Sequence, residues 1–84
     1  MNLEGKTYWN VGASEGLGRA LAQALDTAGA RLILSARSGE RLTSLASTLR
    51  DATALEMDVT DPATIARAMN LAGAVDGVIY SAGQ

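Results

Sequence analysis

Hydrophobic and polar positions follow two kinds of pattern that alternate along the chain. Short runs rich in apolar, aromatic and β-branched residues predict four strands, at 7–11, 32–34, 54–57 and 77–80. Between these runs, apolar residues recur every three or four positions, which is the spacing of an amphipathic helix. The sequence therefore predicts the element order β-α-β-α-β-α-β.

The three helical segments carry recognisable ends. Gly29 stands where a glycine cap ends the first helix, Ser38 is a candidate N-cap for the second, and Asp61-Pro62 is an acidic N-cap followed by proline at the first helical position. The apolar residues at helical spacing are Leu17, Leu21, Ala24, Leu25 and Ala28, then Leu42, Leu45, Ala46 and Leu49, and finally Ile65, Ala68, Met69 and Ala72. The last four are expected to form the buried face of the third helix.

Alternating strands and helices indicate an α/β fold with a parallel sheet and right-handed crossovers. The expected Rossmann-like strand order is 3-2-1-4, with two helices on one face and the third on the other, as a truncated three-layer sandwich. Ligands bind such sheets beyond the carboxyl ends of the strands, where the strand order reverses. Gly12 and Gly83 follow the two strands that flank this point, so residues 1–84 are predicted to form a single dinucleotide-binding domain.

The composition excludes several classes of function. The 84 residues include no cysteine and no histidine, which excludes disulfides and Ser-His or Cys-His nucleophiles, and no metal site is predicted. A net charge of −2 gives no strong cationic field for nucleic acid or anionic lipid. No apolar run reaches the roughly 18 residues that span a bilayer. These features predict a cytoplasmic protein with neither nucleic acid nor membrane as a partner.

A glycine-rich turn, Gly12-Ala13-Ser14-Glu15-Gly16-Leu17-Gly18, joins the first strand to the first helix. One glycine allows the sharp turn, another lets the backbone approach a pyrophosphate, and another lets the helix pack closely on the sheet. The helix N-terminus adds N–H groups and a partial positive charge. Three glycines within seven residues at a strand-to-helix junction favour dinucleotide binding over a plain glycine-rich turn.

Three segments together resemble one family. Residues 11–18 are similar to the TGxxxGxG cofactor motif of the short-chain dehydrogenase/reductase family, and residues 58–61 to its acidic segment after the third strand. Residues 80–83, Tyr-Ser-Ala-Gly, resemble its NNAG motif after the fourth strand. The three segments occur in the order and at the spacing of the family, so the resemblance covers the whole chain.

The resemblance implies a role for particular residues. The glycines of the turn would line the pyrophosphate, Asp58 would bond the adenine amino group, and Val59 would pack on the adenine ring. Ala82 and Gly83 would lie near the ribose of the cofactor. The chain departs from the family pattern at Val11, where threonine is usual, and at Tyr80-Ser81, which replace two asparagines. The candidate cofactor-binding residues are Gly12, Ser14, Glu15, Gly16, Leu17, Gly18, Arg37, Ser38, Asp58, Val59, Ala82 and Gly83.

The end of the second strand predicts which dinucleotide binds. NAD sites place an acid there for the ribose 2′-hydroxyl, whereas an arginine accommodates a 2′-phosphate. Ala36 stands where the NAD-specific aspartate of the family would be, and Arg37 follows it, with Ser35 and Ser38 as further hydroxyl donors. Glu15 argues the other way, because many NADP-preferring relatives are basic there. We predict NADP(H), with NAD as the less favoured cofactor.

The family's catalytic Tyr-x3-Lys pair is not within these residues. The one lysine, Lys6, precedes both tyrosines, so no catalytic residue is assigned and the 84 residues alone are predicted to be inactive. The favoured interpretation is the NADP(H)-binding portion of a short-chain oxidoreductase. The alternatives are a non-catalytic Rossmann module that self-associates, with or without nucleotide, and another Rossmann-type protein such as a methyltransferase, which would need an acid near Ala36.

Two features of the strands point to self-association. One helix does not cover a whole face of four strands, and an open apolar edge is a template for pairing. We therefore expect a homo-oligomer through the edge of the fourth strand and the face beside the third helix. Asn10 is an amide in a strand that should be buried, so it needs hydrogen-bond partners, and the sequence offers no account of it beyond an interface contact.

Overall fold

The computed structural model describes residues 2–13 and 16–80. Its elements are β1 (Thr7–Val11), α1 (Gly16–Thr27), β2 (Arg31–Ser35), α2 (Gly39–Ala46), β3 (Ala52–Ala54), α3 (Pro62–Ala72) and β4 (Gly77–Tyr80). The predicted element order is confirmed.

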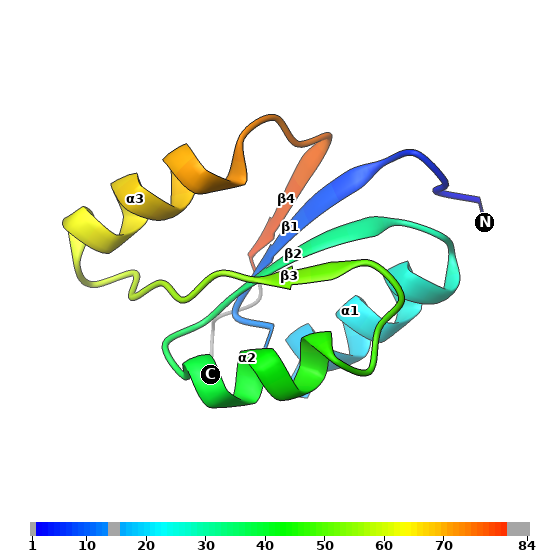
Figure 1. Ribbon diagram of the computed structural model, residues 1–84, viewed down its shortest axis with the longest axis horizontal. Helices are drawn as coiled ribbons and strands as arrows, with labels where there is room; N and C mark the ends of the chain where they lie inside the picture. The colour runs from blue at the N-terminus through cyan, green and yellow to red at the C-terminus, as the bar shows by residue number, and fades with distance from the viewer. Residues whose placement is uncertain (1, 14–15, 81–84) are drawn as a thin grey trace.

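The four strands form one parallel sheet in the order β3-β2-β1-β4, as predicted. Figure 1 shows α1 and α2 on one side of the sheet and α3 on the other, which makes three layers. The fold is therefore an α/β Rossmann-like arrangement in which the crossovers after β1 and β2 use one face and the crossover after β3 uses the opposite face.

The face under α1 and α2 carries the larger core. Leu42 and Leu45 of α2 are fully buried against Leu32 and Leu34 of β2, and α1 contributes Ala22. The predicted spacing of the second helix is thus confirmed at Leu42, Leu45 and Ala46, whereas Leu49 lies beyond the end of α2 and packs against the core from the following turn. Tyr8 packs against the same core, so alternation along β1 turns Asn10 toward these helices as well.

The face under α3 carries a smaller core of Trp9, Val11, Met57 and Ala68. Ile65 and Ala72 pack against it, as expected for the buried face of α3. The expectation for Met69 is wrong, because its side chain is 59% exposed. Met69 lies about 100° around the helix from Ala68, on a flank that no element within residues 2–13 and 16–80 covers.

The third strand was misplaced by the sequence pattern. It is expected at 54–57 but forms at Ala52–Ala54, where Ala52 pairs with Leu32 and Ala54 with Leu34. The bulkier residues that suggested a strand come after it and still bond to the second strand, through Leu55 N–H to Leu34 O and Met57 N–H to Ala36 O. Their side chains pack under α3, which explains the apolar signal there.

The helix ends follow the predicted chemistry. The Ser38 hydroxyl accepts the N–H of Arg41 at 3.4 Å, and the Asp61 carboxylate accepts the N–H of Ala63 at 3.1 Å. Gly29, just after α1, has a φ of +97°, which is a left-handed conformation that favours glycine. Ser38 and Asp61 therefore mark where the loops after β2 and β3 end, and Gly29 marks the loop that begins after α1.

Candidate nucleotide site

The carboxyl ends of all four strands lie at one edge of the sheet, because the strands are parallel. At this edge the chain leaves β1 toward α1 on one face, whereas β4 is reached through α3 on the other face (Figure 1). The strand order reverses between β1 and β4, so the expected ligand crevice of a doubly wound sheet lies there.

The glycine turn begins directly after β1. Gly12 has a φ of +88° and Gly16, the first residue of α1, has a φ of +58°. Both values favour glycine because a side chain at positive φ strains the backbone. A Cβ at Gly16 would meet no atom within 4 Å, so this position faces open space. An anion can therefore approach the start of α1, where the first N–H groups have no acceptor within the helix.

Buried hydrogen bonds hold both ends of this turn. The Ser35 carbonyl accepts the N–H groups of Gly12 at 2.6 Å and Ala13 at 3.3 Å. The Asn10 side-chain amide donates to the carbonyl of Gly18 in the first turn of α1, with Nδ2 and O 2.9 Å apart. An interface contact is therefore not needed to explain Asn10, because this buried amide is bonded within the chain.

Arg37 and Ser38 follow β2 at the same edge. Arg37 is exposed, and Ser38 is half-buried as the N-cap of α2. Ser35 does not join them as a donor for a ligand, because its side chain is fully buried and its hydroxyl accepts the Trp9 indole N–H at 2.8 Å. The expectation for Ser35 is wrong because its side chain points into the core beside Trp9.

The loop after β3 presents Asp58 and Val59. Both the hydroxyl and the backbone N–H of Thr60 donate to Asp58 Oδ1, at 2.7 and 2.9 Å. These two hydrogen bonds, with a contribution from the Arg37 guanidinium, hold the pKa of Asp58 below its usual value against a small opposing effect of burial. Asp58 is thus an ionised acceptor near Arg37, and Val59 beside it is 42% exposed.

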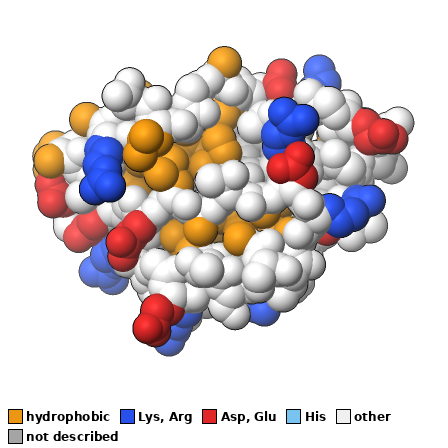
Figure 2. All heavy atoms as spheres, viewed as in Figure 1, with side chains coloured by type: hydrophobic (Ala, Val, Ile, Leu, Met, Phe, Trp, Pro, Cys, Tyr) orange, Lys and Arg blue, Asp and Glu red, His pale blue; other side chains and the backbone are white. Residues whose placement is uncertain are grey.

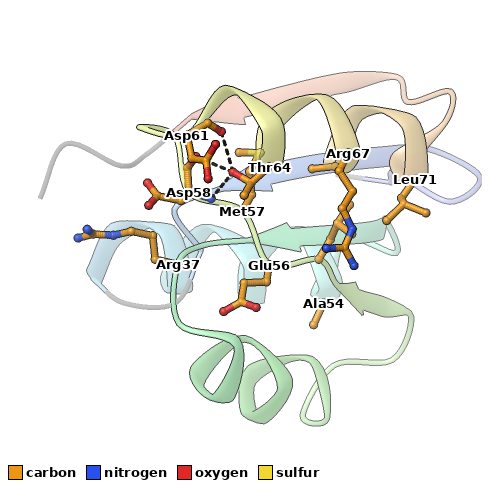
Figure 3. A pocket seen from close by; sticks show the side chains of 11 residues that line it. Arg37, Ala54, Glu56, Met57, Asp58, Asp61, Thr64, Arg67 and Leu71 are labelled. Atoms are coloured by element: carbon orange, nitrogen blue, oxygen red, sulfur yellow. Dashed lines mark hydrogen bonds between the residues drawn. The ribbon is translucent and has the colours of Figure 1, made fainter.

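A pocket of about 510 Å³ opens beside these residues, between α3 and the segment that follows β3. Figure 3 shows Arg37 and Asp58 at one end of this pocket and Arg67, Leu71 and Ala54 toward the other. Hydrophobic side chains gather around this hollow in the space-filling view (Figure 2). The pocket therefore has charged groups at both ends, and apolar residues such as Met57 and Leu71 also line it.

The structure brings most of the expected residues to one edge of the sheet. Gly12, Gly16, Leu17 and Gly18 form the start of α1 and the turn before it, with Leu17 exposed, and Arg37, Ser38, Asp58 and Val59 lie in the next two loops. Ser14, Glu15, Ala82 and Gly83 lie outside the described residues. No cluster of His, Cys, Asp or Glu within 2–13 and 16–80 could hold a metal ion. None of the helices described there has the length and hydrophobicity to cross a membrane.

Two residues around the site were missed by sequence reasoning. Thr60 fixes Asp58, and Thr64 of α3 donates its hydroxyl to the Asp58 carbonyl at 2.8 Å and accepts the Asp58 N–H at 3.0 Å. The spacing of Asp58 and Thr60 is a signal that could have been used, because an aspartate commonly bonds the backbone two residues further on.

A parallel sheet with a glycine turn at its switch point defines a nucleotide-binding α/β protein of the Rossmann class. The family model for short chain dehydrogenases matches residues 6–84, and the chain belongs to this family of oxidoreductases that bind a nicotinamide dinucleotide.

Individual relatives agree with this membership. The chain is 36% identical to the 3-oxoacyl-acyl-carrier-protein reductase FabG of Escherichia coli, over 99% of the chain and 36% of that protein. It superposes with a TM-score of 0.92 at 27% identity on the L-sorbose reductase of Gluconobacter frateurii complexed with NADPH and L-sorbose, covering 100% of the chain and 35% of the reductase. The Pseudomonas aeruginosa RhlG/NADP complex gives a TM-score of 0.86 at 31% identity, over 99% and 36%. The chain thus spans about a third of the length of these relatives.

Proposed function

We propose that this chain is the NADP(H)-binding portion of a short-chain oxidoreductase that transfers hydride to or from a carbonyl or alcohol. The observation that carries the proposal is the convergence of the glycine turn, Arg37 and Asp58 at one edge of the sheet. When bound, the nicotinamide supplies the hydride chemistry, and the protein supplies binding and orientation.

The donor set fits a phosphorylated dinucleotide. The turn from Gly12 to Gly18 would hold the pyrophosphate, with Ser14, Glu15 and Leu17 beside it. Asp58 and Val59 would hold the adenine, and Ala82 and Gly83 would lie near the ribose. Asp58 suits an amino-group donor because its Oδ1 is already fixed by Thr60, which orients the carboxylate. Two relatives named above were solved with NADPH or NADP, which supports the same choice of cofactor.

The preference for NADP(H) depends on Arg37 more than on the start of α2. The Glu56 carboxylate lies against Gly39, where an added Cβ would come within 3.3 Å of Oε2. This negative charge offsets the partial positive charge of the helix N-terminus. Arg37 is therefore the group proposed to bind the 2′-phosphate, with the Ser38 hydroxyl as a second donor.

Calorimetric titration with NADP⁺ and NAD⁺ tests this proposal. We expect NADP⁺ to bind more tightly, and Arg37→Ala to weaken NADP⁺ about tenfold or more while leaving NAD⁺ unchanged, because charge-assisted hydrogen bonds to one phosphate are lost. Arg67→Ala is the matched control, since it removes the same charge from the other end of the pocket. Equal affinity for the two dinucleotides in the unmutated chain would refute the cofactor assignment.

The chain alone is proposed to bind without turnover. Its one lysine is Lys6, and the Tyr-x3-Lys pair implied by the family resemblance is not among these residues. No acid/base pair is therefore assigned to transfer a proton to a carbonyl. NADPH oxidation by the 84 residues in the presence of simple ketones would contradict this, whereas binding without oxidation is the expected result.

A second proposal, self-association, is favoured by the open face of the sheet. Val78 and Tyr80 are 58% and 64% exposed, and their partners Trp9 and Val11 place them on the α3 side. Contiguous exposed apolar residues mark interaction surfaces. We propose that the isolated chain forms a homo-oligomer through β4 and the flank of α3. Sedimentation as a monomer at micromolar concentration would exclude it. We also propose a cytoplasmic location, from the globular composition of the chain and its similarity to the FabG reductases.

A further inference from the structure

Two residues with buried polar side chains, Asn10 and Ser35, hydrogen-bond to the two ends of the glycine turn, Asn10 through its side chain and Ser35 through its backbone carbonyl. Both are 0% exposed, and they are the buried polar residues among 2–13 and 16–80. They stand near the carboxyl ends of the two central strands, on opposite faces of the sheet, since Asn10 alternates with Trp9 and Val11 while Ser35 pairs with Val11. An amide or hydroxyl in such a place is unfavourable unless it is hydrogen-bonded, so the bonds it makes explain its presence.

Asn10 connects β1 to the first turn of α1. Its Nδ2 lies 2.9 Å from the carbonyl oxygen of Gly18, and both residues are buried. Ala22 and Leu25 of α1 pack against the same core through apolar side chains. The amide therefore makes a directional hydrogen bond from β1 to the N-terminal turn of α1, where the phosphate would bind.

Ser35 fixes the opposite end of the turn. Its carbonyl accepts the N–H groups of Gly12 and Ala13, and its hydroxyl accepts the indole N–H of Trp9. Because Gly12 and Ala13 donate to Ser35, the donors left for a phosphate among the described residues of the turn are those at the start of α1. The position of these later donors depends on the bond from Asn10 to Gly18.

We propose that Asn10 is a positioning residue for the pyrophosphate-binding turn, acting through the Gly18 carbonyl to set the start of α1 relative to β1. This inference rests on the proposed function, because it assumes that the turn binds a pyrophosphate. A valine or leucine at position 10 would bury apolar surface without a polar group and would leave the helix start without this bond. Hydrogen bonds weaken steeply with misalignment, so a displaced helix start loses affinity for phosphate.

Two ligands separate positioning from general stability. NADP⁺ contains the pyrophosphate, whereas adenosine 2′-monophosphate reaches only the region of Arg37 and Asp58. NMR titration of the 84-residue chain measures both affinities. We expect Asn10→Leu, which is nearly isosteric but has no donor, to weaken NADP⁺ about tenfold, as loss of one good hydrogen bond would. Adenosine 2′-monophosphate should bind with unchanged affinity.

Ile65→Val is the matched control, because it trims a residue packed against the other core and should change neither affinity. If Asn10→Leu weakens both ligands equally, or neither, the positioning role is wrong. If the unmutated chain binds neither ligand, the proposed function fails instead, so the two failures are distinguishable.

A measurement on the unmutated chain needs no variant to fold. The Nδ2 protons of Asn10 should exchange with water more slowly when NADP⁺ is bound. The bound ligand stabilises the turn, so the hydrogen bond from Asn10 to the Gly18 carbonyl opens less often. Adenosine 2′-monophosphate should leave their exchange unchanged. Exchange that does not respond to saturating NADP⁺ would overturn the proposal.

Discussion

The two faces of the sheet are built in different ways. On one face, α1 and α2 cover a core that includes Leu32, Leu34, Leu42 and Leu45, all at 1% exposure or less. On the other face, α3 buries only Ala68 fully. Even β4 shows the contrast, because the Tyr8 ring covers Gly77 on the first face while Val78 stays exposed on the second.

The second face adds polar bonds at the start of its helix to a smaller apolar core. At the start of α3, the Thr64 hydroxyl oxygen lies 2.8 Å from the carbonyl oxygens of both Asp58 and Asp61, which share its one proton, and it accepts the Asp58 N–H. These bonds anchor one end of the helix beside the candidate site. The comparison teaches that the first face supplies stability, whereas the second leaves apolar surface for another element to cover.

The largest expected effect is a difference in the free energy of unfolding between mutations on the two faces. Leu42→Ala removes a fully buried side chain and should lower the free energy of unfolding by about 3 kcal/mol, because it leaves a cavity in a close-packed core. Met69→Ala, on the exposed flank of α3, should change it by less than about 0.5 kcal/mol. Urea denaturation followed by the fluorescence of Trp9 measures both. Similar losses at the two positions would show that the faces do not differ in this way.

The same contrast explains which features the sequence predicted. On the face with two helices, the apolar spacing of α2 places Leu42 and Leu45 correctly, although Leu17 of α1, at the same kind of spacing, is 64% exposed. The strand order followed from the alternation of elements and from crossover handedness. On the sparser face, periodicity alone placed Met69 in the core, because a pattern does not reveal where a covering element stops.

Other predictions differ from the structure in the bounds of the β3 strand and in the hydrogen-bond partners of the two buried polar residues. The β3 strand consists of small residues, Ala52 to Ala54, and the bulkier Leu55 and Met57 that suggested it lie beyond its end. Asn10 and Ser35 satisfy their hydrogen bonds with residues that the fold brings near them, Gly18 and Trp9. The second of these partners is 26 positions away, which no local pattern predicts. The candidate site was predictable because its glycines, Arg37 and Asp58 follow consecutive strands.

A smaller effect concerns association through the second face. Val78→Lys places a charge in the middle of the exposed edge strand and should convert an oligomer of the isolated chain to monomers. Stability of the monomer should change little, since Val78 is exposed. Thr53→Lys is the matched control at the other edge strand and should leave the oligomer intact. Sedimentation velocity distinguishes these outcomes, and a mutant that stays oligomeric would place the contact elsewhere.

The smallest expected effect tests the polar bonds that support the second face. The Thr60 hydroxyl and N–H hold the pKa of Asp58 below its usual value. Thr60→Val keeps the shape and the backbone donor but loses the hydroxyl, so the pKa of Asp58 should rise toward its usual value. Carboxyl NMR titration measures this, and Thr43→Val, whose hydroxyl bonds Gly39 in α2, should leave that pKa unchanged.

The sign of the linked effect on stability follows from the direction of the shift. Because the pKa of Asp58 is lower in the folded chain, its ionised form stabilises the fold at pH values above the unfolded pKa, near 3.9. This contribution is lost as the pH falls through the lower folded pKa, so acid should weaken the loop between β3 and α3. In Thr60→Val the folded and unfolded pKa values lie closer together, and stability should depend less on pH in that range. An unchanged pH dependence would mean that the Asp58–Thr60 turn does not support α3, and that its anchoring comes from Thr64 and Asp61 alone.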